Sequence, residues 1–285
     1  MSRNRDRVGA QPDTSPPAAN MNQEAGGGAP FSFVVPTEFV DLPSGGRFYP
    51  EGHPLHNQDS LEIRQMTAKE EDMLTSRTLL KKGVALDRVI QSIIVDKRID
   101  PDSLLVGDRN AVIIATRISG YGAEYETKVT CPACGTSQKY GFNLNDSTIH
   151  TGIDDEFSDI TDNNDGTFNV VLPRTGVDVT FKLLDGHDER RLLAGVTNDN
   201  KRKAEGKAIT RQLANMIVAV NDDDTPQAIK YLVENIPSLD ARHLRLSYRR
   251  VAPNIDLTQD FSCQECGHEQ EMEVPLSAEF FWPDR

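Results

Sequence analysis

The sequence lacks the features of a secreted or membrane protein. No apolar run is long enough to cross a bilayer, no secretory leader is recognisable, and only four of the 285 residues are cysteines. These absences predict a cytosolic protein whose thiols stay reduced, and they disfavour disulfide bonds.

Recognisable catalytic motifs are also missing. The six histidines are scattered, and there is no H-E-x-x-H, G-x-S-x-G or P-loop pattern. His187 lies among carboxylates in the stretch from Asp185 to Glu189, where it could act as a base. A solvent-facing residue in the first turn of a helix explains it equally well. We therefore expect no enzyme activity and no catalytic or cofactor-binding residues.

The net charge of the chain indicates which kinds of partner it can bind. The formal net charge is −13 and the pI is about 4.9, which argues against nucleic acid as a bulk electrostatic partner. A hydrophobic content of 37% with 26% charged residues indicates a folded protein with some disordered parts.

The four cysteines form two short pairs. Cys131 and Cys134 stand in C-P-A-C-G, and Cys263 and Cys266 stand in C-Q-E-C-G, 132 positions later (263 − 131). Two such turns supply the four soft ligands of a tetrahedral zinc, so we predict a closed, structural zinc ribbon. Two separate redox sites are the main competitor, although neither pair opens a helix after a strand. His268 could replace one cysteine as a ligand, but a polar residue on a hairpin tip is the simpler interpretation.

The flanks of the two pairs align without a gap. Val129 falls on Phe261, Gly135 on Gly267, Tyr140 on Met272 and Leu144 on Leu276. Alternating apolar residues on both sides predict that each pair lies at the tip of a β-hairpin.

The segment before the first cysteine pair predicts a strand followed by helices. Thr67 and Glu70 form a capping box, and the helix that follows should continue to Gly83. Val89, Ile90 and Ile93 lie on the apolar stripe of a second helix. A third helix should start after the candidate cap Asp108 and end at the glycines of Gly120-Tyr-Gly122.

A similar order recurs after residue 169. Leu172-Pro-Arg-Thr-Gly176 resembles Leu42-Pro-Ser-Gly-Gly46, Asp185 aligns with Thr67, and Asp240 falls 132 residues after Asp108 (240 − 108). The stripe Ile209, Leu213, Met216, Ile217 and Val220 repeats the second helix, and Thr225-Pro226 marks another helix start. We infer two tandem pseudo-repeats that share one zinc, although recurring α+β patterns by chance are the alternative.

The expected fold class is therefore α+β, in four parts. These are a disordered arm over residues 1–30, a first repeat over 31–150, an acidic linker or hairpin over 151–168 and a second repeat over 169–285. Order should begin with a strand-like apolar entry at Phe31–Pro36. Within the acidic part, Asn164-Asp-Gly166 predicts a hairpin turn. Calcium is rejected because Leu172 stands where a calcium loop needs a bidentate Glu.

The ordered set of motifs resembles a known family, the T4-type bacteriophage baseplate hub-assembly proteins. The resemblance covers about Phe39 to Leu144 well and continues more loosely to the C-terminus. The residues that carry it are Leu42-Pro-Ser-x-Gly46 with Tyr49, Leu61-x-Ile-Arg-x-Met-Thr67 with Glu71 and Leu74, Gly107-Asp108, Arg117, Tyr121-Gly122 and Cys131-Pro-x-Cys-Gly135.

The resemblance implies a non-enzymatic structural or assembly protein of the central hub of a contractile-tail phage baseplate. Its partners would be other hub or tail proteins, and it would act in the host cytoplasm during assembly and, if retained, in the virion. The alternative is a zinc-ribbon nucleic-acid-binding or transcription regulatory protein. Lys128 and Lys139 offer that alternative some positive charge, but Glu269, Glu271 and Glu273 crowd the second hairpin.

Overall fold

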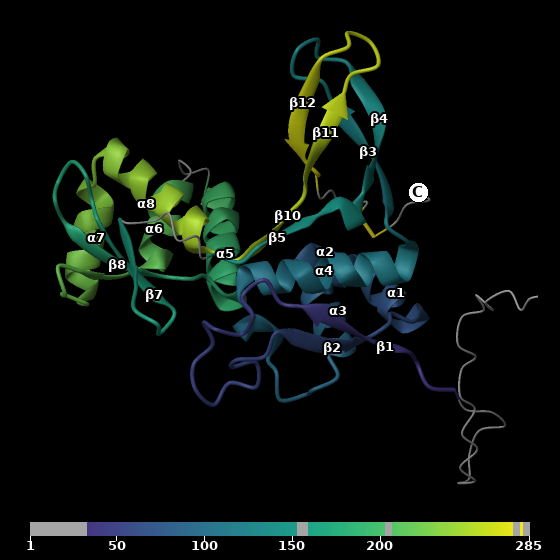
Figure 1. The fold of residues 1–285 in the computed structure, drawn as a ribbon, viewed down its shortest axis with the longest axis horizontal. Coiled ribbons are helices and arrows are strands. Elements are labelled where there is room, and N and C mark those ends of the chain that lie inside the picture. Colours follow the sequence, from purple (N-terminus) through teal and green to yellow (C-terminus); the bar gives the residue numbers. More distant parts are fainter. Residues whose placement is uncertain (1–32, 153–158, 203–206, 276–279, 282–285) are drawn as a thin grey trace, which may run out of the picture. The chain divides into compact units, whose positions relative to one another are not determined.

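The computed structural model describes residues 33–152, 159–202, 207–275 and 280–281 (Figure 1). Contacts divide the chain into two units, residues 1–35 and 36–285. The expected arm over residues 1–30 lies outside the described residues, as do residues 153–158 of the acidic segment. None of the described helices is long and apolar enough to span a membrane.

Helices and strands both occur in residues 36–285, which confirms the α+β class. The buried hydrophobic side chains of this unit, from Val40 to Phe281, form one cluster. Its described α-helices and strands up to residue 150 are β1 (Thr37–Asp41), β2 (Ser60–Arg64), α1 (Ala68–Thr75), α2 (Arg77–Lys82), α3 (Ala85–Ile93), α4 (Val106–Tyr121), β3 (Glu124–Thr130), β4 (Ser137–Asn143) and β5 (Thr148–His150). The later ones are β6 (Ile160–Asp162), β7 (Thr167–Val171), β8 (Asp178–Lys182), α5 (Gly186–Arg202), α6 (Ala208–Met216), β9 (Ile217–Val220), α7 (Pro226–Asn235), α8 (Ser238–Val251), β10 (Asn254–Asp256), β11 (Thr258–Ser262) and β12 (Glu269–Glu273).

The strand pairs in the described part of the chain are antiparallel. β1 pairs with β2, and β6-β7-β8-β9 form a four-stranded sheet. β3 pairs with β4 and β11 with β12, so both cysteine pairs lie between the strands of a hairpin, as predicted. β5 pairs with β10, which joins segments more than a hundred residues apart.

Several expected helix starts are confirmed. α1 begins with the Thr67–Glu70 capping box, in which the Glu70 carboxylate accepts the Thr67 N–H at 3.0 Å. Thr225 caps α7 by accepting the N–H of Ala228 at 3.3 Å.

The predicted hairpin turn is also confirmed. The turn at Asn164-Asp-Gly166 connects β6 and β7, with Asn164 and Gly166 at positive φ.

Four local predictions are wrong. The helix from Thr67 does not run to Gly83, because Ser76 is extended and its side chain accepts the Leu79 N–H to start α2. α6 ends at Met216, and Ile217 and Val220 lie in β9, where β-branched side chains pack well against β8. Regular structure starts at Thr37 rather than at the apolar entry Phe31–Pro36; Phe31 and Ser32 lie outside the described residues. The fourth error concerns Asp108.

Asp108 does not cap a helix but anchors a loop. α4 starts at Val106, two residues before Asp108, and its N-cap position is Leu105. The buried Asp108 carboxylate accepts the Ser44 N–H at 2.9 Å, the Ser44 hydroxyl at 2.6 Å and the Tyr49 hydroxyl at 2.7 Å. Burial raises the pKa of Asp108, although the hydrogen bonds from Ser44 and Tyr49 act in the opposite direction.

Asp240 makes the corresponding contacts near the start of α8. Its fully buried carboxylate accepts the Arg174 N–H at 2.8 Å, the Thr175 N–H at 3.0 Å and the Thr175 hydroxyl at 2.8 Å. Like Ser44, these residues belong to the loop that follows the first strand of a hairpin, here between β7 and β8.

A second pair of matching contacts stabilises the start of α1 and α5. The Arg64 guanidinium lies 2.7 Å from the Glu70 carboxylate, and the Lys182 ammonium lies 2.7 Å from the Asp188 carboxylate. The two pairs are 118 positions apart (182 − 64 and 188 − 70), and both carboxylates are completely buried. Burial alone would raise the pKa of Glu70, but hydrogen bonds from Arg64, Ser92 and Thr67 hold it well below its usual range.

The segments before and after residue 152 are joined directly. The Val106 N–H donates to the Leu184 carbonyl at 3.0 Å. A Cβ atom on Gly107 would lie 1.9 Å from the carbonyl oxygen of Pro253, so only glycine permits this approach of α4 to the segment before β10.

Arg117, on α4, is also fully buried. Its guanidinium donates to the carbonyls of Phe280 at 2.6 Å, Gly122 at 2.5 Å and Glu124 at 3.0 Å. Burial lowers the pKa of Arg117. This side chain ties residue 280, near the C-terminus, to the end of α4.

The carboxylate of Asp240 should be necessary for stability. Replacing Asp240 with Ala leaves the N–H groups of Arg174 and Thr175 and the Thr175 hydroxyl without their buried acceptor. Because Arg174 and Thr175 are exposed, water can replace part of the lost hydrogen bonding, and the free energy of unfolding should fall by roughly 1–2 kcal/mol. Urea denaturation of the full chain measures this. Asp72→Ala, on the exposed side of α1, is the control and should change the free energy by less than about 0.5 kcal/mol. Equal effects of the two substitutions would contradict the anchoring role.

Candidate metal centre

Both hairpin tips have the same backbone structure. The Gly135 N–H donates to the Cys131 carbonyl at 2.9 Å, and the Gly267 N–H donates to the Cys263 carbonyl at 2.9 Å. Gly135 and Gly267 have φ angles of 74° and 68°, which other residues rarely adopt. The glycine after each C-x-x-C is therefore required by the turn that brings its two thiols together.

The structure brings all four predicted ligands together. The sulfurs of Cys131 and Cys266 are 3.8 Å apart, and those of Cys134 and Cys263 are 3.7 Å apart. All four sulfurs lie within 4.8 Å of one another. Zinc–sulfur bonds of about 2.3 Å in a tetrahedron place the sulfurs about 3.8 Å apart. The arrangement could therefore hold one metal ion between the two tips.

The first cysteine of each pair is buried and the second is exposed. Hydrogen bonds from Thr136 lower the pKa of the Cys134 thiol to about 6. The His268 N–H lowers the pKa of the Cys266 thiol, but burial and the neighbouring thiols of Cys134, Cys263 and Cys131 together outweigh it and raise this pKa to about 12. Four thiols this close cannot all ionise without a cation between them.

Side chains hold the two hairpins together beside the thiols. The Gln259 amide accepts the Asn143 N–H at 3.2 Å and donates to the Asn143 carbonyl at 2.8 Å. The Tyr140 hydroxyl donates to the Asp260 carbonyl at 3.0 Å, and the rings of Tyr140 and Phe261 have centroids 5.1 Å apart. Figure 1 shows the β3–β4 and β11–β12 hairpins side by side.

Of the side chains that connect the two hairpins, Gln138 lies nearest to the sulfurs. Its amide donates to the Ser262 carbonyl at 3.3 Å, and its oxygen accepts the Gln264 N–H at 3.1 Å. The same oxygen lies 3.6 Å from the Cys263 sulfur. Sequence reasoning missed Gln138 and Gln259, because a polar residue in a hairpin arm is ordinarily solvated. The alternation of side chains along each strand could have revealed them, because it places these two amides on the side of the hairpin that faces the other hairpin.

The histidines considered from the sequence lie elsewhere. His268 is not among the clustered ligand atoms, and its ring faces the Gln270 amide at 3.4 Å. His187 is half exposed on α5, with its ring 3.8 Å from the Asp100 carboxylate.

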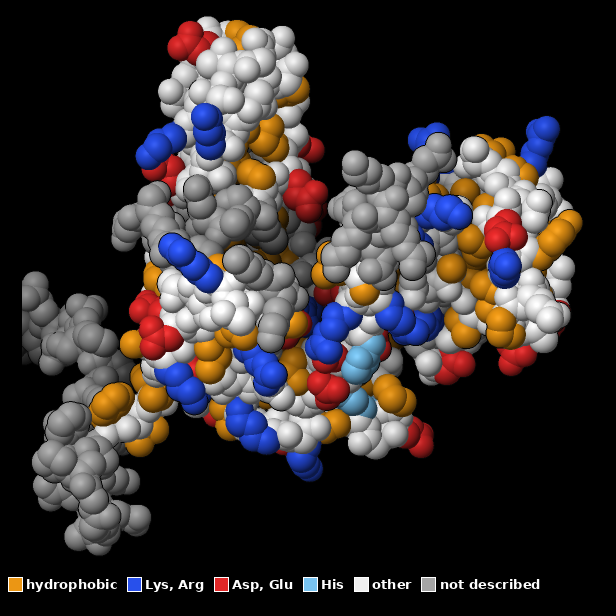
Figure 2. All heavy atoms as spheres, turned by 180° about the vertical axis from the view of Figure 1, so that it is seen from behind, with side chains coloured by type: hydrophobic (Ala, Val, Ile, Leu, Met, Phe, Trp, Pro, Cys, Tyr) orange, Lys and Arg blue, Asp and Glu red, His pale blue; other side chains and the backbone are white. Residues whose placement is uncertain are grey.

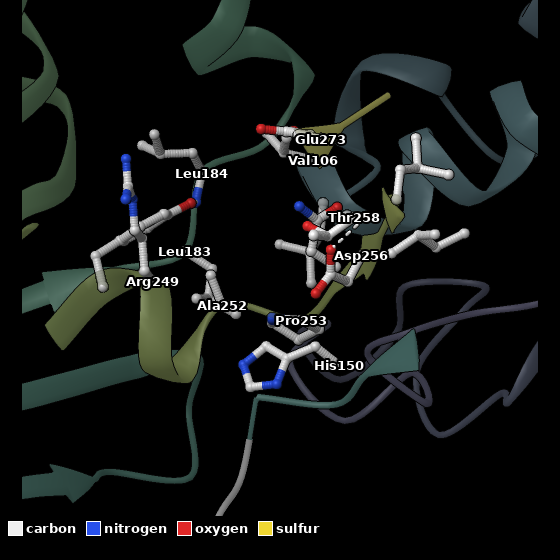
Figure 3. A pocket seen from close by; sticks show the side chains of 16 residues that line it. Val106, His150, Leu183, Leu184, Arg249, Ala252, Pro253, Asp256, Thr258 and Glu273 are labelled. Atoms are coloured by element: carbon white, nitrogen blue, oxygen red, sulfur yellow. Dashed lines mark hydrogen bonds between the residues drawn. The ribbon is translucent and has the colours of Figure 1, made fainter. Parts of the chain in front are cut away.

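A cavity of about 520 Å³ lies where α4, α8 and β10 meet. In Figure 3, Arg249 lies on the opposite side of this cavity from Asp256 and Thr258. His150 is engaged with the Arg250 carbonyl at 2.9 Å, and the Asp256 carboxylate accepts the Thr258 N–H at 2.8 Å. The described residues that line the cavity include the hydroxyls of Thr258 and Tyr248 but neither serine nor cysteine.

Residues 35–282 match a family model described as T4 bacteriophage base plate protein. The match covers most of the chain and confirms the resemblance to a baseplate family, over a longer range than the segment where the motifs were clearest. Comparison with curated proteins and with solved structures found no match.

The rate at which each cysteine reacts should depend on whether it is the buried first or the exposed second cysteine of its pair. After chelation of bound metal, iodoacetamide at neutral pH should modify Cys134 before the other thiols, because it is exposed and has a lowered pKa. Buried Cys131 and Cys263 should react last. Peptide mass spectrometry at successive times measures the order, with urea-unfolded protein as the control. Equal rates at all four cysteines in the folded protein would contradict the arrangement.

Proposed function

Because the chain belongs to the T4 bacteriophage base plate protein family, in which it has a structural role in a phage baseplate, we propose that it is a non-enzymatic structural or assembly protein of the central hub. The observation that carries this proposal is the family match together with a scaffold in which four thiols join segments 132 residues apart (263 − 131). Such a scaffold suits a protein that acts through surfaces.

The metal in this proposal is one structural zinc ion. Cys131, Cys134, Cys263 and Cys266 would bind it as thiolates, a donor set that soft divalent metals prefer. Four thiolates fill a tetrahedral shell and leave no position at which water could be activated. The ion would add on the order of 10 kcal/mol to the stability of the fold, as in zinc-finger peptides.

The zinc would join two tandem repeats that arose by duplication. Residues 106–144 align without a gap on residues 238–276, and this range includes Asp108 with Asp240 and all four cysteines. The matching loop anchors and the matching Arg64–Glu70 and Lys182–Asp188 pairs support this interpretation. The repeats would occupy residues 31–150 and 169–285, with the acidic linker or hairpin between them.

The partners would be other hub or tail proteins, met in the host cytoplasm during assembly and in the baseplate of the virion. Residues 1–30 would supply an arm that orders on a neighbour.

The charge distribution disfavours the zinc-ribbon nucleic-acid alternative. Asp260, Glu269, Glu271 and Glu273 are exposed on the second hairpin, and Lys139 of the first hairpin is paired with Glu126 at 3.2 Å. A ribbon that binds phosphates requires an uncompensated basic face.

Metal analysis tests the zinc proposal. Purified protein should contain one zinc per chain by mass spectrometry, and Cys263→Ser should lose both the zinc and cooperative unfolding because one ion joins both hairpins. Gln264→Ser, between the two ligands of the same turn, is the control and should keep the metal. Zinc that survives Cys263→Ser would contradict a shared site.

Cells infected by the encoding phage test the hub role. When tail assembly is blocked, the tagged protein should co-purify with unassembled hub proteins and be absent from head-associated fractions. Its presence in intact tails would show that it is retained, and its absence there would indicate an assembly chaperone. Co-purification with heads or with phage DNA alone would contradict the proposal.

A further inference from the structure

α8 has an exposed face whose arginine side chains form no ion pair with any described residue. Its buried side comprises Asp240, Ala241, Leu244, Ser247 and Val251. The opposite side is basic and partly apolar. We call it the basic face, and it consists of Leu239, Arg242, Arg245, Leu246 and Arg249.

The side chains of the basic face are available for contact. Leu239 is 56% exposed and Leu246 is 40% exposed. Arg242 and Arg249 are exposed as well, and among the described residues neither forms an ion pair. Residues 239, 242, 246 and 249 follow the spacing i, i+3, i+7 and i+10, so they form one stripe along the helix.

The corresponding stripe of α4 is covered. The residues 132 positions earlier are Gly107, Asn110, Ile114 and Arg117. Gly107 touches the Pro253 carbonyl, the Asn110 amide donates to Asn254 at 3.1 Å, and Ile114 and Arg117 are buried. The same helix face is therefore an intramolecular contact in one half of the chain and exposed in the other.

The chain itself carries a surface of opposite charge. Asp260, Glu269, Glu271 and Glu273 point to one side of the β11–β12 hairpin, all are exposed, and none pairs with a described cation. We call this the acidic face. Asp260 lies directly opposite Glu271, and like charges in that position destabilise a hairpin. A cationic partner would remove this cost.

The charges of the two faces are spread over similar lengths. Arg242 and Arg249 are seven residues apart on a helix, about 10 Å. Glu269 and Glu273 are four residues apart on a strand, about 13 Å. Arg249 and Glu273 line the same cavity within one chain but form no ion pair there (Figure 3). Figure 2 shows Lys and Arg side chains beside hydrophobic ones on the part of the molecule that carries α5–α8.

We propose that the chain self-associates head to tail, with the basic face of one copy docked on the acidic face of a second copy. The contact joins two different surfaces, so one contact leaves a free face at each end, and further copies extend a ring or a row. Leu239 and Leu246 add apolar contact to the charge pairing.

Sedimentation velocity of the full-length, metal-loaded protein tests the proposal. Association should increase with protein concentration at about 50 mM salt and weaken strongly at about 500 mM salt, because the exposed charges are screened. R242E/R249E and E271R/E273R should each weaken self-association by at least about tenfold. The control R77E/R88E changes the charge equally at exposed positions of α2 and α3 and should leave association unchanged.

Mixing the two charge-reversed variants gives the decisive result. The mixture should associate although neither variant does so alone, because each reversed face then meets its complement. A monomer at every concentration, or a mixture that fails to associate, would overturn the proposal. A labelled DNA duplex that binds wild type but not R242E/R249E, without self-association, would instead assign the basic face to nucleic acid.

Discussion

The contact between the two cysteine hairpins is the constraint on which the rest of the structure depends. It brings residues near 131 next to residues near 263, and every element between them must fit within that closed loop. A glycine turn in each hairpin makes it geometrically possible, and the contacts of Gln138, Tyr140 and Gln259 hold the two hairpins against each other beside the sulfurs. A metal ion bound by the four thiols would add to these contacts between the hairpins.

Buried charges provide a second layer of organisation. Asp108 and Asp240 each hold a loop by accepting its N–H and hydroxyl groups, and Glu70 and Asp188 each hold a cation at the start of a helix. A buried carboxylate is tolerated only when its lone pairs are satisfied. These sites therefore select one loop conformation, whereas an apolar contact would permit several.

The sequence predicted what depends on local chemistry. The cysteine hairpins, the Thr67 capping box, the Thr225 cap and the turn at Asn164 all follow from short patterns with a fixed geometry. The sequence singles out Asp108 as a candidate cap, but its actual partners Ser44 and Tyr49 lie 64 and 59 positions away. No local pattern reveals such partners. β9 was mistaken for helix because its apolar residues continue the stripe of α6, while pairing with β8 decided the outcome.

The long separation of the two hairpins has a kinetic consequence. During synthesis, the first C-x-x-C leaves the ribosome well before the second exists, so its thiols meet their partners only after residue 266 has been translated. Contacts of such high sequence separation form late, because the closure entropy must be overcome first. Until then Cys131 and Cys134 have only each other as neighbouring thiols. The time between translation of residue 134 and residue 266 is therefore the period in which this chain is most vulnerable to oxidation and to incorrect pairing with another copy.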